Sequence, residues 1–163
     1  MLNRLTPQSA ALLIFAVALA TILGAWVFEY FGYAPCELCL KQRWAYYAAI
    51  PLALVVALIA PSNSTPARLG LYALAAMWTA SMVFGIYHSG VEWKWWLGPG
   101  TCTGNGGLSG GLPDLTKPVV MCDQPAIRIL GLSLAGWNGV ISLALVFVAL
   151  KGARAQGSSS VSQ

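Results

Sequence analysis

The sequence predicts an all-α membrane protein, a four-helix antiparallel bundle with a long external loop between its third and fourth helices. Of the 163 residues, 58% are hydrophobic and only 9% are charged, whereas soluble domains contain about 25% charged residues. Four long stretches contain no charged residue, and about 20 apolar residues are enough to cross the hydrocarbon core of a bilayer. The chain is therefore expected in a membrane.

The expected helices follow these uncharged stretches. They cover approximately residues 10–28, 38–60, 69–87 and 129–150. Residues 61–66 are rich in turn formers and join the second and third helices as a hairpin.

The remaining segments are expected to be loops or a tail. Residues 29–37 and 88–128 form external loops, so residues 1–151 make one membrane domain. The Ser-rich end, residues 152–163, is expected to be disordered.

The first apolar stretch also has features of a secretory signal peptide. Arg4 precedes it, and Ala18-Leu19-Ala20 within it resembles a cleavage site. The apolar stretch continues to Phe28, which is longer than a typical signal core. We therefore expect the first helix to be retained.

The loop before the fourth helix contains two distinct compositions. Its start, residues 91–96, is rich in Trp, and because Trp rings settle at headgroup depth it is expected to lie flat on the membrane. Residues 98–111 are rich in glycine and surround Cys102. Such backbone is costly to order and moves easily, which suits a thiol that visits two partners.

A Cys-x-x-Cys motif, Cys36 to Cys39, lies where the second helix is expected to begin. Pro35 suits a first helical turn because it has no N–H to lose. Both sulfurs then lie near a helix N-terminus, where the helix dipole favours a thiolate. Arg43 follows Cys39 by one turn and places a positive charge on the same face, so we expect a reactive dithiol with its stabilised thiolate at Cys39.

All four cysteines are expected at one end of the bundle. They are Cys36, Cys39, Cys102 and Cys122. Disulfides persist in oxidising spaces such as the periplasm, and exchange proceeds by thiolate attack through a mixed disulfide, so two pairs can pass an oxidising equivalent between them. A zinc site and two inert stapling disulfides are the alternatives. We expect no metal, because the second pair is not a second Cys-x-x-Cys.

Two polar residues accompany the expected helices near this end. His88, the single histidine of the chain, ends the third helix at the level of Cys39 and precedes Glu92 by one turn. A neutral imidazole can donate a hydrogen bond or relay a proton near pH 7, so a functional role competes with a structural one. Asn138 in the fourth helix is expected to join helices by a hydrogen bond rather than to bind a ligand.

The charge distribution bears on partners and orientation. The net charge of +4 forms no basic stripe, so nucleic acid is not an expected partner. Four crossings put both termini on one side, where no acid is expected. The basic residues of that side are Arg4, Arg68, Lys151 and Arg154. The other side has five, Lys41, Arg43, Lys94, Lys117 and Arg128, so the count alone does not set the orientation. Lys94 and Lys117 lie in a long loop, where basic residues count for little, so we expect cytoplasmic termini and outward-facing cysteines.

These motifs resemble the disulfide bond formation protein B (DsbB) family of bacterial inner membranes. The resemblance covers four membrane helices and a second cysteine pair after the third. It also covers Pro-Cys-Glu-Leu-Cys-Leu-Lys-Gln-Arg-Trp at 35–44 and Gly-Ile-Tyr-His-Ser-Gly-Val-Glu-Trp at 85–93. It implies a quinone-dependent enzyme with periplasmic cysteines. Such an enzyme reoxidises a periplasmic dithiol oxidase resembling DsbA and passes electrons to ubiquinone or menaquinone.

The same resemblance implies roles for the cysteines. Cys36 and Cys39 look like the quinone-facing pair, and Cys102 and Cys122 look like the partner-facing pair. In the implied order, the reduced partner attacks Cys102, the released Cys122 attacks Cys36, and Cys39 is left as a thiolate against the quinone.

Arg43 and His88 look like quinone-site residues, and Glu92 is expected with them. The alternative is a non-enzymatic membrane adaptor whose loop is stapled by disulfides or zinc. A thiol–quinone enzyme of the vitamin K epoxide reductase type is disfavoured by resemblance, because its cysteine pair lies near the last helix.

Overall fold

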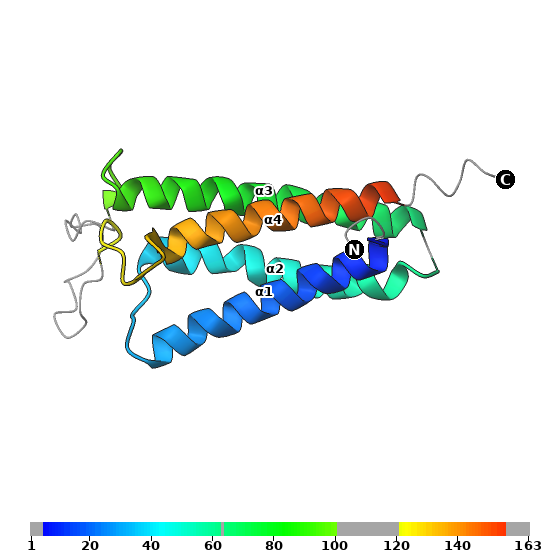
Figure 1. Ribbon diagram of the computed structural model, residues 1–163, viewed down its shortest axis with the longest axis horizontal. Helices are drawn as coiled ribbons and strands as arrows, with labels where there is room; N and C mark the ends of the chain where they lie inside the picture. The colour runs from blue at the N-terminus through cyan, green and yellow to red at the C-terminus, as the bar shows by residue number, and fades with distance from the viewer. Residues whose placement is uncertain (1–4, 63, 101–120, 156–163) are drawn as a thin grey trace, which may run out of the picture.

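Four long helices make up most of the described chain in the computed structural model (Figure 1). The structure describes residues 5–62, 64–100 and 121–155. The helices are α1 (Pro7–Tyr30), α2 (Glu37–Ile59), α3 (Ser64–Glu92) and α4 (Leu134–Ala155). A short antiparallel hairpin, β1 (Arg128–Ile129) with β2 (Leu132–Ser133), precedes α4. The predicted all-α class is confirmed.

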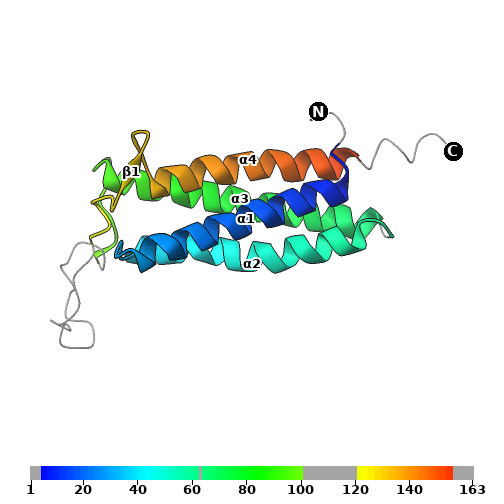
Figure 2. The same cartoon turned by 60° about the horizontal axis from the view of Figure 1, so that its bottom comes forward.

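The helices lie along one long axis, each antiparallel to the next (Figures 1 and 2). The most extensive contact is between α3 and α4, and α2 packs against both α1 and α3. The start of α1 and the end of α4 lie at the end of the bundle where α2 leads into α3 (Figure 1). The opposite end contains the start of α2, the end of α3 and the hairpin. We call it the cysteine end, because Cys36, Cys39 and Cys122 lie there.

Small residues allow the helices to approach closely. A Cβ added to Gly85 of α3 would lie 2.9 Å from the backbone nitrogen of Gly139 of α4. Likewise, a Cβ on Gly70 of α3 would collide with Val56 of α2. Lipid provides little hydrophobic drive between membrane helices, so close van der Waals packing at such small residues holds them together.

The outside of the bundle suits a lipid environment. All four helices are long and apolar enough to cross a membrane, judged by length and composition. Large apolar side chains are exposed along them, among them Leu12, Leu23, Val55 and Phe147. Exposed apolar surface of this extent is unfavourable in water and favourable in hydrocarbon. The chain is a multi-pass membrane protein.

Several helix ends differ from the expected ones. The third helix, expected over 69–87, begins at Ser64 and continues to Glu92. The fourth begins at Leu134 rather than 129 and continues to Ala155, so the first part of the expected disordered tail is helical. Residues 156–163 lie outside the described residues. Hydropathy marks the apolar part of a helix, whereas backbone hydrogen bonding continues into polar residues on either side.

The hairpin occupies residues expected at the start of the fourth helix. Its turn residues, Leu130 and Gly131, have φ values of 52° and 85°, the positive angles that a two-residue type I′ turn requires. The backbone N–H of Gly136 donates to Ser133 Oγ at 3.1 Å. Ser133 thereby satisfies one of the unpaired N–H groups at the start of α4, which sets the helix start after the hairpin.

The first two residues of the Trp-rich segment belong to α3. Val91 and Glu92 are buried in the last turn of α3. Trp96 folds back onto that helix, where its Nε1 donates to the Tyr87 carbonyl oxygen at 2.9 Å and its ring stacks on the Tyr87 ring. The expected interfacial segment is therefore a helix end followed by a partly exposed aromatic turn.

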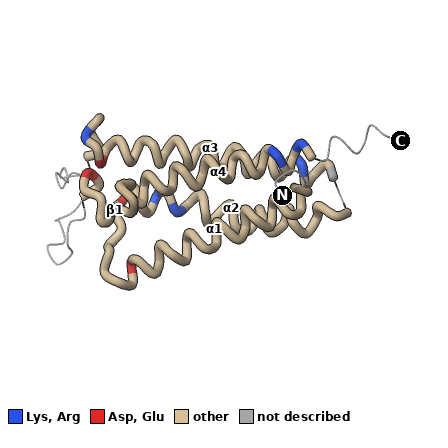
Figure 3. Tube along the Cα trace, in the orientation of Figure 1, with Lys and Arg blue, Asp and Glu red and all other residues tan. Residues whose placement is uncertain are grey.

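Charged residues differ between the two ends of the bundle (Figure 3). Among the described residues, the end with the termini contains Arg68, Lys151 and Arg154 and no acid. The acids lie toward the cysteine end, and they are Glu29, Glu37, Glu92 and Asp123.

Candidate active site

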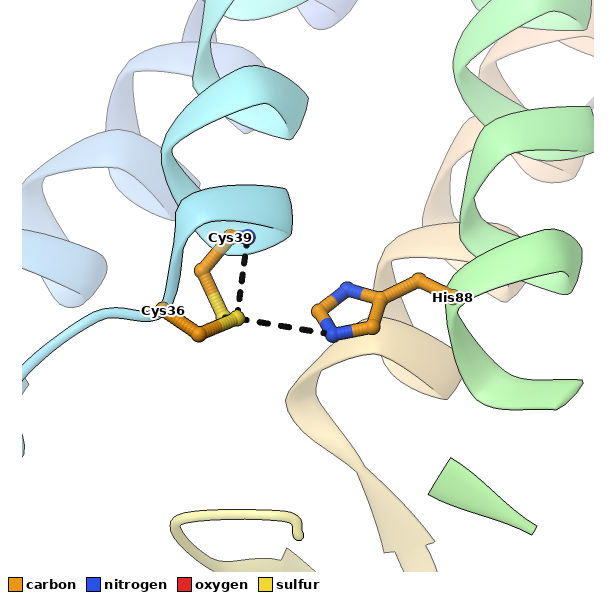
Figure 4. Close-up of side chains that lie close together, drawn as sticks. All are labelled: Cys36, Cys39 and His88. Atoms are coloured by element: carbon orange, nitrogen blue, oxygen red, sulfur yellow. Dashed lines mark hydrogen bonds between the residues drawn. The ribbon is translucent and has the colours of Figure 1, made fainter. Parts of the chain in front are cut away.

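The Cys-x-x-Cys motif lies at the N-terminus of α2 (Figure 4). Cys36 is the N-cap residue, and its Sγ accepts a hydrogen bond from the backbone N–H of Cys39 at 3.2 Å. The two Sγ atoms lie 2.8 Å apart, and both residues are free thiols. The predicted position of the motif at a helix N-terminus is confirmed. The partial positive charge of that terminus acts on the sulfur of Cys36.

His88 and Glu92 of α3 lie against this sulfur. His88 Nε2 is 3.6 Å from Cys36 Sγ (Figure 4) and 3.8 Å from Glu92 Oε1. His88 is 1% exposed and Glu92 8% exposed. In the described part of the chain, His88 Nδ1 and Glu92 Oε2 are buried without a hydrogen-bond partner. The structure thus brings both residues to Cys36.

The local interactions favour ionisation of Cys36. Hydrogen bonding with the Cys39 thiol lowers the pKa of Cys36 most, and the hydrogen bond with His88 lowers it further. Burial opposes both, and the resulting pKa is about 4. Cys36 is then a thiolate at neutral pH, with the Cys39 thiol as its donor. The expectation that the stabilised thiolate is at Cys39 is wrong, because Cys36 caps the helix and contacts the histidine.

Arg43 pairs with a residue that the sequence did not indicate. Its Nη1 lies 2.7 Å from Glu29 Oε2, and the Arg43 side chain is 13% exposed. Glu29 is the penultimate residue of α1, so the pair forms only because α1 packs against α2. The Arg43 charge was expected beside Cys39, whereas its ion-pair partner is Glu29.

A cavity of about 310 Å³ lies between α1, α2 and α4. Cys39 and Arg43 line it, together with mostly apolar residues such as Ile22, Phe28 and Ile141. Cys36, His88 and Glu92 are not among the residues that line this cavity. The two cysteines therefore face different surroundings, with Cys39 at the cavity and Cys36 toward α3.

The polar wall of the cavity includes residues from α2 and α4. Tyr46 donates a hydrogen bond to Asn138 Oδ1 at 2.6 Å, and Asn138 Nδ2 donates to the Ser81 carbonyl oxygen at 3.4 Å. The predicted interhelical role of Asn138 is confirmed, and this residue also lines the cavity. Gln42 Nε2 is buried at the cavity without a partner among the described residues.

Gln42 and Tyr46 were not expected at the site, although the sequence contains a signal for them. With Arg43 they follow Cys39 at i+3, i+4 and i+7, which places them on one helix face. That face lines the cavity.

The second cysteine pair is described in part. Cys122 is disulfide-bonded and 1% exposed. It belongs to a small buried cluster with Cys36, Leu38 and Val91. Cys102 lies outside the described residues. The structure therefore places Cys122 in the same cluster as Cys36.

Fold and site together define a class of protein: a multi-pass membrane protein with a dithiol at one end of a four-helix bundle, beside an apolar cavity. The family model described as disulfide bond formation protein DsbB matches residues 7–151. The chain belongs to this family. It is a membrane oxidoreductase of disulfide bond formation.

The chain is also similar to a protein of Rickettsia prowazekii (strain Madrid E) described as uncharacterized. The two are 27% identical over 143 residues, which cover 83% of this chain and 81% of that protein. No solved structure shows significant similarity to this chain.

Proposed function

We propose that this protein is a thiol:quinone oxidoreductase that reoxidises a DsbA-like periplasmic thiol oxidase and passes the electrons to a membrane quinone. The observation that carries the proposal is the separation of the two motif sulfurs. Cys39 lines an apolar cavity together with Arg43, while Cys36 lies in the cluster that contains Cys122. This separation supports a role for Cys39 toward the electron acceptor and for Cys36 in exchange with the second pair.

The cavity residues fit a quinone ring. Its wall is mostly apolar, as a planar ring and its isoprenoid tail require, and it lies between membrane helices. Two groups supply hydrogen-bond donors for ring oxygens: the Arg43 guanidinium and the unpartnered Gln42 Nε2. A bound quinone accepts two electrons and two protons. In this site Arg43 orients a ring oxygen and favours negative charge on it.

Each exchange step breaks one disulfide and forms another, so no metal or further oxidant is needed. The reduced partner attacks Cys102, which releases the Cys122 thiolate, and Cys122 then attacks Cys36. Attack on Cys36 breaks a Cys36–Cys39 disulfide and leaves Cys39 as the departing thiolate at the cavity. The shared buried cluster of Cys36 and Cys122 supports this order.

The partner is proposed to be periplasmic, and the exchange then requires the cysteine end on that side. The two ends carry similar numbers of Lys and Arg. Lys94 and Lys117 belong to the long loop before α4, where basic residues count for little, and this favours the cytoplasm for the end with the termini.

A half-reaction without the partner tests the quinone step. In a Cys102→Ser/Cys122→Ser background, Cys36 and Cys39 are the remaining thiols. The purified protein is reduced, freed of reductant under argon, and mixed with a short-chain ubiquinone or menaquinone. We expect loss of both thiols with one quinone reduced per chain. Thiols that persist with either quinone, in protein with intact helices, would contradict the proposal.

A further inference from the structure

Three potential metal ligands converge at the cysteine end, and a carboxylate lies beside them. The Sγ atoms of Cys36 and Cys39 and Nε2 of His88 all lie within 4.8 Å of one another. Glu92 Oε1 lies 3.8 Å from the same His88 nitrogen. Cys36, His88 and Glu92 are buried. Two sulfurs and one imidazole are three ligands of a tetrahedral ion, and the Glu92 carboxylate becomes the fourth if it moves closer to the sulfurs.

The separations around His88 Nε2 are compatible with metal ligands. Ligand atoms at about 2.3 Å (sulfur) and 2.0 Å (nitrogen) in a tetrahedral zinc site are about 3.5 Å apart. Cys36 Sγ and His88 Nε2 are separated by 3.6 Å. A direct hydrogen bond between a charged carboxylate and an imidazole is shorter, about 2.7–2.9 Å, than the 3.8 Å between Glu92 and His88.

We propose that the reduced Cys36–Cys39 pair, His88 and Glu92 form a binding site for Zn²⁺. The site exists only in the dithiol state, because a disulfide removes both thiolates. It forms when the sulfurs, now 2.8 Å apart, move to the separation of about 3.8 Å that two zinc-bound thiolates adopt. The ion balances the charge of two thiolates, one of them buried, that would otherwise lie beside a carboxylate with a single imidazole.

The consequence is control of the enzyme by metal. Zinc bound to both sulfurs blocks their oxidation and their exchange with the second pair, so the reduced enzyme is held inactive. Oxidised enzyme is insensitive. Binding of the ion can be tested without the quinone or the partner, so it does not depend on the identity of the electron acceptor.

The test uses full-length protein in detergent with the substitutions Cys102→Ser and Cys122→Ser, so that Cys36 and Cys39 are the remaining thiols. The protein is reduced, freed of reductant under argon, and titrated with Co²⁺. We expect one ion per chain, a thiolate-to-cobalt charge-transfer band in the near ultraviolet and the visible bands of tetrahedral cobalt. Zn²⁺ should displace the cobalt. The same protein with its disulfide re-formed should give no such bands.

Variants then assign the other two ligands. Competition with a chromophoric chelator should show Zn²⁺ affinity reduced at least about 100-fold in His88→Ala and at least about tenfold in Glu92→Gln, since even outer-shell partners of a metal are worth 10- to 100-fold. Glu37→Gln is the matched control, because Glu37 lies between the two cysteines but its side chain is 40% exposed. It should leave the affinity unchanged.

Three results would overturn the site. These are absence of the charge-transfer band in reduced protein, equal binding after re-oxidation, and unchanged affinity in His88→Ala with helical circular dichroism intact. The first two do not depend on any substitution at the site, so they decide the matter even if His88→Ala does not fold.

Discussion

Cys36 and Cys39 begin the same helix but differ in what surrounds them. Cys36 Sγ accepts the backbone N–H of Cys39 and contacts His88. Cys39 lines the cavity with Arg43. The sequence contains the motif and the proline before it, but nothing in it says which sulfur caps the helix. Which sulfur caps the helix depends on the backbone at Cys36, which is extended, and on the packing of α3 against α2.

The lowered pKa of Cys36 predicts its reactivity. In metal-free buffer, a Cys39→Ser variant keeps a hydroxyl donor near Cys36, and its alkylation rate should rise much less steeply from pH 6 to 8 than that of an ordinary cysteine, because hydrogen bonds at position 39 and with His88 lower the pKa of Cys36. An ordinary cysteine, of pKa about 8.5, gains about tenfold per pH unit over that range.

Cys39→Ala is the comparison, because it removes the donor that lowers the pKa of Cys36 most. Its alkylation profile should shift to higher pH. A rate in Cys39→Ser that rises steeply up to pH 8 would show that the Cys36 thiol is not stabilised as its contacts indicate.

Arg43 should act mainly on the quinone step. Arg43→Leu removes both the charge and the fork of donors, and kcat should fall by about 10²- to 10³-fold, the usual cost of losing a donor to developing negative charge. Arg43→Lys keeps the charge only and should be intermediate. The measurement is a quinone titration of each purified variant.

Lys41→Leu is the matched control for Arg43. Lys41 pairs with Glu37 on the exposed face of α2, where an ion pair contributes little, so its kinetics should match the parent. If Arg43→Leu keeps the parental kcat and KM, Arg43 is a membrane anchor and the quinone site lies elsewhere.

At the scale of the elements, uncharged runs predicted the four crossings because hydrocarbon excludes charge along the whole span. The ends were less predictable. Arg128 to Ser133 form a hairpin rather than helix, since Leu130 and Gly131 adopt positive φ. The contact between Arg43 and Glu29 also lay beyond the sequence, because it depends on how α1 packs against α2.

Gly24 offers a test of the cavity through α1. It lines the cavity, and nothing lies within 4 Å of a Cβ built there. Gly24→Leu should therefore fold normally, while its side chain occupies cavity space that the proposed quinone ring needs. We expect the KM for quinone to rise about tenfold, equivalent to about 1.4 kcal/mol, with the thermal midpoint in detergent unchanged.

Gly85→Ala separates this effect from general damage. Its Cβ meets the backbone of Gly139 at 2.9 Å, so it should lower the thermal midpoint without a selective change in the KM for quinone. A parental KM in Gly24→Leu would remove this cavity as the quinone site.

At the scale of the whole molecule, the account requires the cysteine end to face the periplasm. Both termini then lie in the cytoplasm with Arg68, Lys151 and Arg154. A C-terminal fluorescent protein should be fluorescent, and a C-terminal alkaline phosphatase should be inactive, because that enzyme needs periplasmic disulfides. Active phosphatase at this terminus would show the opposite orientation, with the cysteines in the reducing cytosol.

The most direct test of the central claim is the stoichiometry of the complete reaction. Purified protein, catalytic in amount, is mixed with a reduced DsbA-like oxidase and a quinone under argon, and thiols and quinone are measured together. The account predicts two partner thiols lost for each quinone reduced, sustained over many turnovers. It also predicts no turnover with Cys102→Ser or Cys122→Ser, although both variants should keep Cys36 and Cys39 oxidisable by quinone. Partner thiols that remain reduced, or thiol loss without quinone reduction, would contradict it.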